Sequence, residues 1–532
     1  MNSGHKAAAV LVVGGGPVGL AAAHLLGSFG VRTVLVERNT ATSDEAKAIS
    51  LDDESLRTFQ LCGLAEEIAP VIVPGTGTRY FGVGGRPLLH ARGTVRFQFG
   101  HAFKNQFAQP ELERVLLRGL EKRPEVEVRF ATELIEYRQD ADGVDALVKD
   151  ADGEHRLRVD YLLGCDGGRS TVRQQAAIPM TGKRYPDVWL VADTLDDPHD
   201  ERFGMHYGDP RRPHVVIPGR GGRCRYEFLL HDGEGEPGDD PSFELIRRLL
   251  RPFREITPDQ VERAVNYRFN AVVADRWRDR RVFLLGDAAH MMPPFAGQGL
   301  NSGIRDAANL CWKLARVLEG VAGDELLETY ERERLPHARA TVRLSVLLRN
   351  VVMTTRMSAA VLRDLVIRAA MLTPAGRSYF TGMRYRPSPA LAAGLVVGAP
   401  HAESCDLLGR ALEQPRVLLP DGHSTASLDD LIGSGFAILG VDVDARAWAR
   451  VQASPLAGLG AVELDILTGD RLPRADADRP GAADVDGRLH RLFGPVRGRF
   501  VVVRPDRYVC AVLTPDQAAG AGREIERLLG RP

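Results

Sequence analysis

A glycine-rich turn between two apolar runs limits the fold of this chain more than any other feature. Residues 14–19 read Gly-Gly-Gly-Pro-Val-Gly and follow an apolar run at 7–13. A second apolar run, at 31–36, ends at Glu37. This order predicts a strand, a helix that begins at Pro17 and a second strand, which is the arrangement of a dinucleotide-binding turn. We therefore expect an α/β domain with a parallel sheet.

The glycines of this turn have separate expected roles. Gly14 permits the tight turn, Gly16 lets the backbone approach a pyrophosphate, and Gly19 lets the helix pack on the strand. The amides at the start of the helix would face the phosphates. Glu37 stands where an acid can accept the ribose hydroxyls. The alternative is a glycine-rich turn that binds no ligand. Motifs further along the chain have to distinguish this turn from a nucleotide site.

Composition narrows the classes of partner. The chain has 532 residues, enough for about three domains. Its 69 basic and 70 acidic residues give a net charge of −1, so we expect no nucleic acid and no membrane surface as partner. No apolar stretch approaches the roughly 20 residues that span a bilayer, and we expect a cytoplasmic protein. The cysteines form no CxxC pair and no metal-ligand spacing, so we expect free thiols and no metal site; they are Cys62, Cys165, Cys224, Cys311, Cys405 and Cys510.

Changes in composition and hydrophobic pattern along the chain predict the domain organisation. Residues 1–180 alternate apolar runs and helical patterns, and 76–102 is expected to contribute to a neighbouring sheet. Residues 181–277 are rich in Pro, Gly, Arg and aromatic residues, which predicts a mainly β insertion. Residues 278–390 begin with a buried strand and continue as helices, and 395–532 read as a last, small α/β domain.

A second segment favours FAD over NAD. Asp287 follows the apolar run 281–285 and precedes a glycine-rich lead-in, 295–303, to a helix at about 301–319. An acid there could hold a ribityl or pyrophosphate-side hydroxyl. The amides of the lead-in would stabilise the negative charge of a reduced flavin. A simple NAD site does not need this second segment. A capping acid and an ordinary helix lead-in are the alternatives.

Taken together, the motifs resemble those of the class A FAD-dependent aromatic hydroxylases, which are flavoprotein monooxygenases. Three motifs carry the family: GGGPVG at 14–19, CDGGRS at 165–170 and GDAAHMMPPFAGQGLNSGIRDAANLCWKLA at 286–315. Shorter stretches make the chain most similar to the 3-(3-hydroxyphenyl)propionate hydroxylase branch; they lie at 50–57, 109–112, 224–228 and 504–508.

The resemblance implies a fold and a set of cofactor contacts. It implies an FAD-binding Rossmann-like domain from 1–180 and 278–390, an inserted mainly β substrate domain at 181–277, and a C-terminal thioredoxin-like domain at 395–532. Lys47 stands where the family usually has Arg, and a lysine loses the bidentate fork toward phosphate. The implied FAD contacts are Gly14, Gly16, Pro17, Gly19, Glu37, Arg38, Lys47, Gln109, Asp166, Gly286, Asp287, Pro294, Gly297, Gln298, Gly299, Leu300 and Asn301.

The resemblance also implies the reaction. NADH or NADPH would reduce FAD, and O2 would then form a C4a-hydroperoxyflavin that hydroxylates a phenolic aromatic substrate such as 3-(3-hydroxyphenyl)propionate. The protein's task would be to orient the ring and to keep water away. A homodimer is a further expectation, with 324–384 or the last domain as the interface.

Candidate substrate contacts lie on the strand at 223–230. Arg225 and Glu227 share one face by the period of two, and Tyr226 lies on the other. Arg225 could pair with a substrate carboxylate; a structural pair with Glu227 or exposure to solvent is the alternative. Tyr226 could wall an aromatic pocket, with core packing as the alternative.

Five further residues are candidates for the substrate side. His290 and Pro293 lie in the 286–303 segment, which is expected beside the flavin. The alternative for His290 is a structural histidine, and the alternative for Pro293 is a plain turn. His206, Tyr207 and Trp189 lie in the inserted domain. A tyrosine or histidine near a phenol could ease its deprotonation, and the sequence does not single one out.

Other functions remain open at this point. A hydroxylase of polyketide or antibiotic scaffolds would carry the same cofactor motifs. A flavin-dependent halogenase would need a Trp-x-Trp-x-Ile-Pro motif, which the chain lacks. A non-catalytic binding protein on a flavoprotein fold would have no need of the segment at 286–303. An NAD-dependent dehydrogenase would leave that segment unexplained.

Overall fold

The computed structural model describes residues 8–45, 47–92, 97–398, 406–469 and 479–530, and Cys405 lies outside these ranges. The chain divides into two compact units, which are described one at a time. The first unit comprises residues 1–96, 102–307 and 338–387, and the second comprises 97–101, 308–337 and 388–532. Helices α7 (Gly299–Leu318) and α8 (Glu325–Val352) contribute residues to both.

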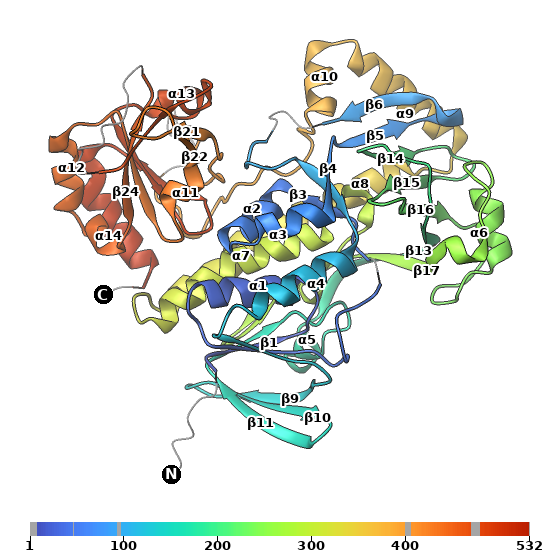
Figure 1. Cartoon of the computed structure of the whole chain (residues 1–532), viewed down its shortest axis with the longest axis horizontal. Coiled ribbons are helices and arrows are strands. Elements are labelled where there is room, and N and C mark those ends of the chain that lie inside the picture. The colour runs from blue at the N-terminus through green and yellow to red at the C-terminus, as the bar shows by residue number, and fades with distance from the viewer. Residues whose placement is uncertain (1–7, 46, 93–96, 399–405, 470–478, 531–532) are drawn as a thin grey trace. The chain divides into compact units, whose positions relative to one another are not determined.

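A six-stranded, mainly parallel sheet forms the base of the first unit. Its strand order is β18-β19-β12-β1-β2-β8, and β1 pairs in parallel with β12 and β2. The strands are β18 (Arg278–Asp279), β19 (Val282–Leu284), β12 (Tyr161–Gly164), β1 (Val10–Val13), β2 (Thr33–Val36) and β8 (Val126–Arg129). All four residues of β1 are buried, as expected for a strand covered on both faces. Helices α1 (Pro17–Ser28) and α4 (Gln109–Leu120) lie side by side against it (Figure 1).

An eight-stranded sheet forms the second layer of this unit, in the order β20-β17-β13-β16-β15-β14-β5-β6. Its strands are β20 (His290–Met291), β17 (Val261–Ala274), β13 (Met180–Thr194), β16 (Cys224–Leu229), β15 (His214–Pro218), β14 (Gly204–Tyr207), β5 (Thr78–Phe81) and β6 (Pro87–Ala91). One face packs against α6 (Phe243–Leu250). The other face packs against Phe295 of the loop that precedes α7. The strand β20 belongs to the same loop, so the sheet and the loop are joined.

Smaller elements complete the first unit. The strands β9 (Glu133–Gln139), β10 (Val144–Asp150) and β11 (Gly153–Val159) form an antiparallel sheet. A further sheet joins β3 (Ser50–Asp52), β7 (Lys104–Phe107) and β4 (Ile72–Gly75), and β3 leads into α2 (Asp53–Leu61). The remaining helices are α3 (Ala65–Ile68), α5 (Thr171–Gln175), α9 (Met357–Met371) and α10 (Pro374–Thr381). Helices α7 to α10 agree with the expectation that 278–390 begins with a buried strand and continues as helices.

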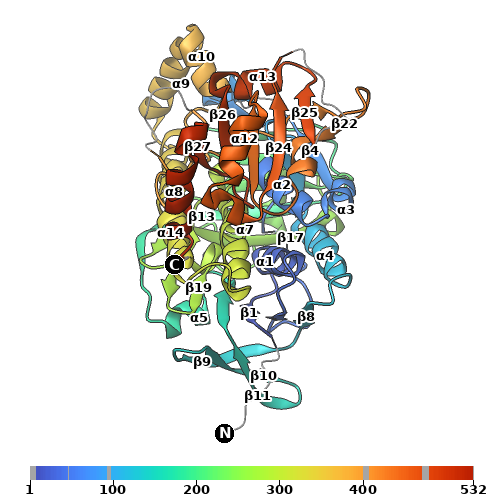
Figure 2. The same cartoon turned by 90° about the vertical axis from the view of Figure 1, so that its left-hand side faces the viewer.

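The second unit contains a seven-stranded sheet in the order β22-β21-β25-β24-β23-β26-β27. Its elements are β21 (Arg416–Leu418), β22 (Thr425–Ser427), α11 (Leu428–Ile432), β23 (Ala437–Val441), α12 (Ala445–Gln452), β24 (Val462–Leu467), β25 (Gly481–Asp484), α13 (Arg488–Phe493), β26 (Arg499–Val503), β27 (Val509–Leu513) and α14 (Ala518–Leu528). Strand β23 runs parallel to β24 and antiparallel to β26, which is antiparallel to β27. Figure 2 shows α12 and α14 in front of this sheet. This is the order and direction of a thioredoxin-like fold.

Among the described residues, no helix has both the length and the apolar character needed to cross a bilayer. The cysteines within the described ranges are free thiols, namely Cys62, Cys165, Cys224, Cys311 and Cys510. The described residues also contain no group of three or more His, Cys, Asp or Glu side chains placed to hold a metal ion.

Candidate functional site

The glycine-rich turn leaves open backbone at the start of α1. Gly14 has a φ of +108°, which side chains rarely adopt. A Cβ on Gly19 would lie 1.9 Å from the carbonyl oxygen of Gly14, so the helix packs directly on the turn. A Cβ on Gly16 would meet no atom within 4 Å. Pro17 is the first residue of α1, and the open amides at this helix end attract an anion.

Glu37 is fixed beside the turn. Its Oε2 accepts a hydrogen bond from the amide of Gly15 at 2.7 Å, and its Oε1 accepts one from the amide of Asn39 at 2.9 Å. Arg38 next to it is exposed. Oε1 also accepts from Asn39 Nδ2 at 2.7 Å, so Oε2 is the oxygen that can accept a further hydrogen bond. The geometry therefore places an acid where the sequence predicts one that binds a ribose, and this role stays a prediction.

Asp287 is an accessible acid in a buried segment. Its neighbours at 282–286 and 288–290 are buried, whereas its own side chain is exposed. The surrounding protein raises its pKa by desolvation, and the charges of His290 and Lys47 oppose this effect. Gly286 before it has a φ of +58°. An accessible carboxylate at this point can hold a hydroxyl-bearing group, and the open turn at Gly16 can hold a diphosphate. The described residues therefore fit the FAD that the sequence predicts.

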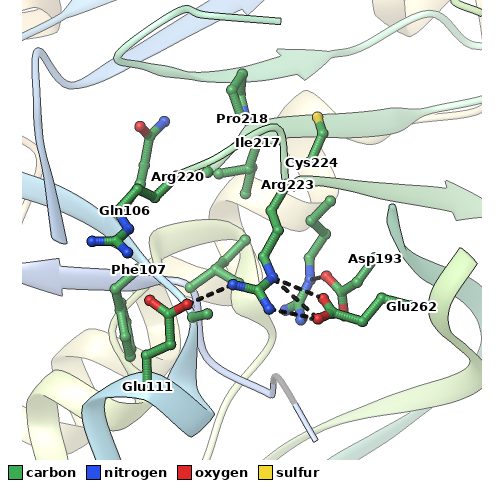
Figure 3. A pocket seen from close by; sticks show the side chains of 14 residues that line it. Gln106, Phe107, Glu111, Asp193, Ile217, Pro218, Arg220, Arg223, Cys224 and Glu262 are labelled. Carbon is green, nitrogen blue, oxygen red and sulfur yellow. Dashed lines mark hydrogen bonds and ion pairs between the residues drawn. The ribbon is translucent and has the colours of Figure 1, made fainter. Parts of the chain in front are cut away.

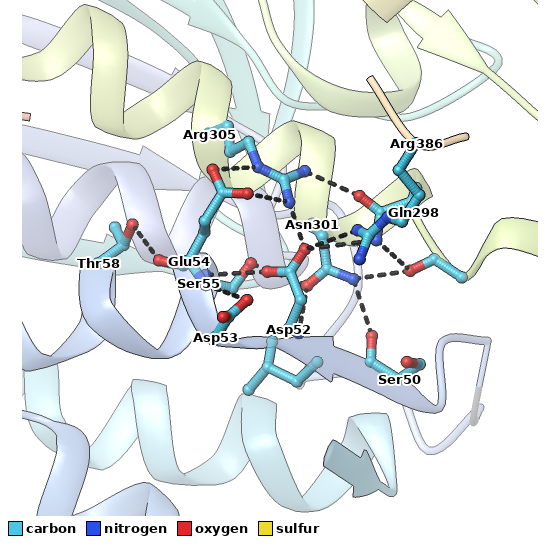
Figure 4. Close-up of polar contacts among 12 residues, drawn as sticks. Ser50, Asp52, Asp53, Glu54, Ser55, Thr58, Gln298, Asn301, Arg305 and Arg386 are labelled. Atoms are coloured by element: carbon cyan, nitrogen blue, oxygen red, sulfur yellow. Dashed lines mark hydrogen bonds and ion pairs between the residues drawn. The ribbon is translucent and has the colours of Figure 1, made fainter. Parts of the chain in front are cut away.

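The loop before α7 is held by the buried amide of Asn301 (Figure 4). Its Nδ2 donates to the carbonyls of Gly297 at 2.8 Å and Ser50 at 3.0 Å. Its Oδ1 accepts from the amide of Asp52 at 2.9 Å. Gly297 has a φ of +62°, and a Cβ on Gly299 would meet nothing within 4 Å. The loop backbone is thus held in place by Asn301, and at Gly299 it has open space beside it.

A buried ion-pair network extends this support (Figure 4). The guanidinium of Arg305 pairs with Asp52 and lies 2.9 Å from Glu54 Oε2, and it donates to Gln298 Oε1 at 3.0 Å. Burial alone would raise the pKa of Asp52, but Arg305 and Arg386 hold it below its usual value. Side chains from the two sequence motifs at 50–57 and 286–315 are therefore linked by ion pairs and hydrogen bonds, and these links position the loop.

His290 supports the same loop from within. Its Nε2 lies 2.8 Å from Asp306 Oδ2, and both side chains are fully buried. Asp306 Oδ2 also accepts a hydrogen bond from the amide of Gly286 at 3.1 Å. Pro293 is buried and Pro294 is exposed, at a short 3-10 turn. The geometry favours a positioning role for His290. Contact between His290 and the substrate stays a prediction.

Three other predicted cofactor residues are engaged by nearby protein atoms. Gln109 Oε1 accepts from the amide of Ala48 at 2.7 Å. Lys47 Nζ lies at the surface, 3.1 Å from Glu45 Oε2. Asp166 Oδ2 accepts from the amide of Val172 at 3.1 Å, at the start of α5, and burial raises its pKa. Leu300, in the first turn of α7, is half-buried. Their contacts with FAD remain predictions.

Tyr226 lies on the face of the eight-stranded sheet that α6 covers. It packs with Cys224 and Phe228 in the apolar cluster beneath α6, and its hydroxyl donates to Asp197 Oδ2 at 3.0 Å. Tyr207 packs against the same cluster. This is the core-packing alternative considered above, and it places Tyr226 on the face opposite to Phe295.

The other face of the sheet carries an aromatic wall beside the loop. The ring of Phe295 lies 5.2 Å from that of Trp189 and 5.6 Å from that of Phe269. His206 is buried, with its ring 5.2 Å from that of Tyr80. Burial and the nearby charge of a lysine lower the pKa of His206 to about 3, so its imidazole is neutral. Trp189 and His206 thus lie on the face where a substrate beside the flavin loop would bind.

Arg225 is buried on this second face and is paired. Its guanidinium makes two hydrogen bonds with Asp193, at 2.7 and 2.9 Å, and a third with the carbonyl of Lys47 at 2.8 Å. The alternative of solvent exposure is wrong, because the side chain is only 4% exposed. Figure 3 shows the adjoining surface pocket, where Arg223 lies 2.5 Å from Glu111 and 2.8 Å from Glu262. These arginines are already neutralised by protein acids.

Sequence reasoning missed two charged residues here, namely the buried Glu227 on this face and the half-buried Lys104 in the neighbouring sheet. Lys104 in β7 and Glu227 in β16 influence each other's charge, and burial shifts the pKa of both toward the neutral form. Glu227 was considered only as a partner of Arg225. A lysine in the strand that precedes Gln109 gives no pattern that distinguishes it from a surface lysine in a single sequence.

Comparisons with known proteins agree with this geometry. Residues 7–345 match a family model described as an FAD binding domain, and 409–528 match an HcaD C-terminal domain. A protein named 3-(3-hydroxy-phenyl)propionate/3-hydroxycinnamic acid hydroxylase from Mycolicibacterium smegmatis is 37% identical over 94% of this chain and 89% of its own length. The protein of that name from Mycolicibacterium gilvum is 38% identical over 96% of this chain and 90% of its own.

A solved structure extends the agreement to the fold. The ternary complex of aklavinone-11 hydroxylase with FAD and aklavinone covers all of both chains, with a TM-score of 0.79 at 24% identity. At this identity the likeness concerns the fold alone. The family model spans more than half of the chain, and the curated relatives span nearly all of it. This chain belongs to the FAD-dependent aromatic hydroxylases.

Proposed function

We propose that this protein hydroxylates 3-(3-hydroxyphenyl)propionate or a closely related phenolic acid, with FAD as cofactor and with O2 and NADH or NADPH as co-substrates. The observation that carries the proposal is the 37–38% identity to hydroxylases of that name over 94–96% of this chain. The likeness to the aklavinone hydroxylase is restricted to fold. Bound FAD would supply the activation of oxygen.

The protein's own residues have three tasks in such a reaction. The open backbone at Gly16, the carboxylate of Asp287 and the loop at 297–301 would hold the cofactor. The rings of Trp189 and Phe295 form an apolar wall beside that loop. This wall would orient an aromatic ring and exclude water from the reacting atoms.

The first experiment measures NADH and NADPH oxidation by the purified yellow protein with and without 3-(3-hydroxyphenyl)propionate. We expect strong stimulation by the phenolic acid and a product heavier by one oxygen atom, found by mass spectrometry. The faster nucleotide identifies the preferred reductant. An FAD-loaded protein that shows neither stimulation nor product would contradict the proposed substrate.

Cofactor binding is tested separately with two variants. Gly16→Val places a side chain in open space, so the fold should persist while the diphosphate is excluded. Asp287→Ala removes the accessible carboxylate and should weaken FAD retention. FAD released by denaturation is quantified against protein concentration. Full occupancy in Gly16→Val would rule out this turn as the cofactor site.

A hydroxylase of a larger aromatic scaffold is the second candidate, because the fold also matches the complex with aklavinone. The same oxidation assay with a polycyclic phenol separates the two. A non-catalytic binding protein on this fold is the candidate of another class, and it predicts FAD-free protein with no oxidation of NADH.

We also propose a homodimer, on the basis of apolar side chains at the surface of α9. Leu362, Leu365 and Val366 are 56–62% exposed, and Leu372 beyond the helix is 82% exposed. Contiguous exposed apolar surface commonly marks a protein interface. Light scattering on a sizing column should give twice the mass of the 58.2 kDa chain. The double variant Leu362→Glu with Leu365→Glu should give the single mass.

A further inference from the structure

Lys104 is a half-buried lysine beside the loop that precedes α7. It begins β7, and among the described residues its Nζ makes one hydrogen bond, to Thr78 Oγ1 at 3.0 Å. A Cβ built on Gly297 would lie 3.6 Å from this Nζ and 3.3 Å from Ser50 Oγ. The ammonium therefore lies next to the loop expected to hold the flavin, on β7 rather than on the substrate sheet.

Among the described residues, no acid forms an ion pair with this cation. Burial, together with the positive charge of Arg386 and opposed by Glu227, lowers the pKa of Lys104 to about 8. Burial also raises the pKa of Glu227, which favours its neutral form. A partly buried ammonium without an ion-paired acid is costly, because the hydration it loses is not fully replaced. A carboxylate brought by a ligand would replace it.

The other cations on this side are already paired. Arg225 is held by both oxygens of Asp193. Arg386 Nη2 lies 3.8 Å from Asp52 Oδ2 (Figure 4). Its guanidinium also lies over the ring of Phe103. Lys104 differs because its hydrogen-bond partner is a neutral hydroxyl. Of the three described cations Arg225, Arg386 and Lys104, only Lys104 therefore lacks an acid within ion-pair distance.

The surroundings of Lys104 suit an aromatic acid. The charge of Lys104 acts on His206, which is neutral and whose ring lies 5.2 Å from that of Tyr80 in a tilted arrangement. The ring of Phe295, from the same loop as Gly297, packs against Trp189. A ligand with an aromatic ring against this wall and a carboxylate at the ammonium would match both features.

We propose that Lys104 binds the carboxylate of the phenolic acid substrate and thereby sets the preference of the enzyme for acids over uncharged phenols. This inference rests on the proposed function and adds the residue that selects its substrate class. It replaces the expectation that Arg225 takes this role.

The experiment compares two ligands that differ only in charge. 3-(3-Hydroxyphenyl)propionate and 3-(3-hydroxyphenyl)propan-1-ol share the ring and the chain, and the alcohol lacks the carboxylate. Binding to the FAD-loaded enzyme is measured by the change in flavin absorbance, and turnover by NADH oxidation. The wild type should bind the acid about 100-fold more tightly than the alcohol.

Three variants test the residue. Lys104→Met should raise the Kd of the acid about 100-fold and leave that of the alcohol within about threefold. Lys104→Gln keeps a hydrogen-bond donor without the charge and should behave like Lys104→Met, which covers the case in which one of them fails to fold. Lys183→Met is the matched control, because Lys183 is exposed in β13 of the same unit, and it should change neither Kd.

Each remaining outcome has a distinct meaning. Equal binding of the acid by the wild type and Lys104→Met would overturn the role of Lys104 and keep the proposed function. An equal loss of acid and alcohol binding would show a merely structural role and overturn the inference. A wild type that hydroxylates neither ligand would overturn the proposed function, and the inference with it.

Discussion

Two lysines, the fully buried Lys313 and the half-buried Lys104, show how differently the two compact units treat the same charge. Lys313 in the second unit is fully buried, and its Nζ lies 2.7 Å from Glu333 Oε2 and 2.8 Å from Asn309 Oδ1. Lys104 in the first unit has Thr78 as its hydrogen-bond partner among the described residues. Burial lowers the pKa of both lysines to about 8.

The partners explain the difference. Glu333 also receives two hydrogen bonds at 2.8 Å from Arg504, which is paired in turn with Asp506. Burial would raise the pKa of Glu333, but Arg504 and Lys313 hold it well below its usual value. Charges around Lys313 are therefore satisfied within the protein, as expected for a structural network. The charge of Lys104 has no ion-paired acid among the described residues. This is expected for a binding site, where some stability is given up for function.

The largest effect should come from removing the acid of the satisfied network. Glu333→Ala leaves Lys313 and Arg504 buried without their shared carboxylate. We expect the free energy of unfolding to fall by about 3–5 kcal/mol. Chemical denaturation followed by circular dichroism measures it, with Glu328→Ala at an exposed position of α8 as control. A loss below about 1 kcal/mol would contradict the distinction between the two lysines.

The same substitution at both lysines should have opposite consequences for stability. Lys313→Met removes one of the cations paired with Glu333 and should lower the free energy of unfolding by about 2 kcal/mol. Lys104→Met removes an ammonium that lacks an acid and should leave stability unchanged or raise it by about 1 kcal/mol. Denaturation of the FAD-loaded variants without substrate decides this. Equal destabilisation by both would mean that Lys104 too is structural.

The pH dependence of substrate binding sharpens the contrast further. Because the pKa of Lys104 is lowered to about 8, its ammonium is present below that pH and is lost as the pH rises through it. The Kd of the acid should therefore be constant near pH 6.5 and rise toward about tenfold per unit above pH 8. The Kd of the alcohol should stay flat over the same range. A flat profile for the acid would remove Lys104 from its recognition.

The sequence predicted the backbone turns of the proposed cofactor side because those turns depend on local patterns. The turn at Gly14 and the lead-in at Gly297 need glycine at positive φ, and such positions leave a trace in the sequence. Their spacing relative to buried strands also follows from the chain order. The family and the thioredoxin-like topology could be predicted for the same reason.

The substrate side could not be predicted in the same way, because it depends on which face of a sheet each side chain reaches. The period of two separated Tyr226 from Arg225, but it did not say which face α6 would cover. Lys104 and Thr78 come from separate strands, β7 and β5, that belong to different sheets. Their hydrogen bond is a tertiary feature with no local pattern, and so is the pairing of Arg225 with Asp193.

The smallest effect should come from the hydroxyl that orients Lys104. Thr78→Val keeps the shape of the side chain and removes the acceptor 3.0 Å from Nζ. The ammonium keeps its charge but loses its fixed position, so we expect the Kd of the acid to rise about threefold, consistent with one hydrogen bond. In the Lys104→Met background the same substitution should change nothing further, because the hydroxyl then has no ammonium to orient. Equal effects in both backgrounds would mean that Thr78 acts on the substrate without Lys104. A coupled effect would establish that the unsatisfied lysine is held in place for its ligand, whereas Lys313 is held in place for the fold.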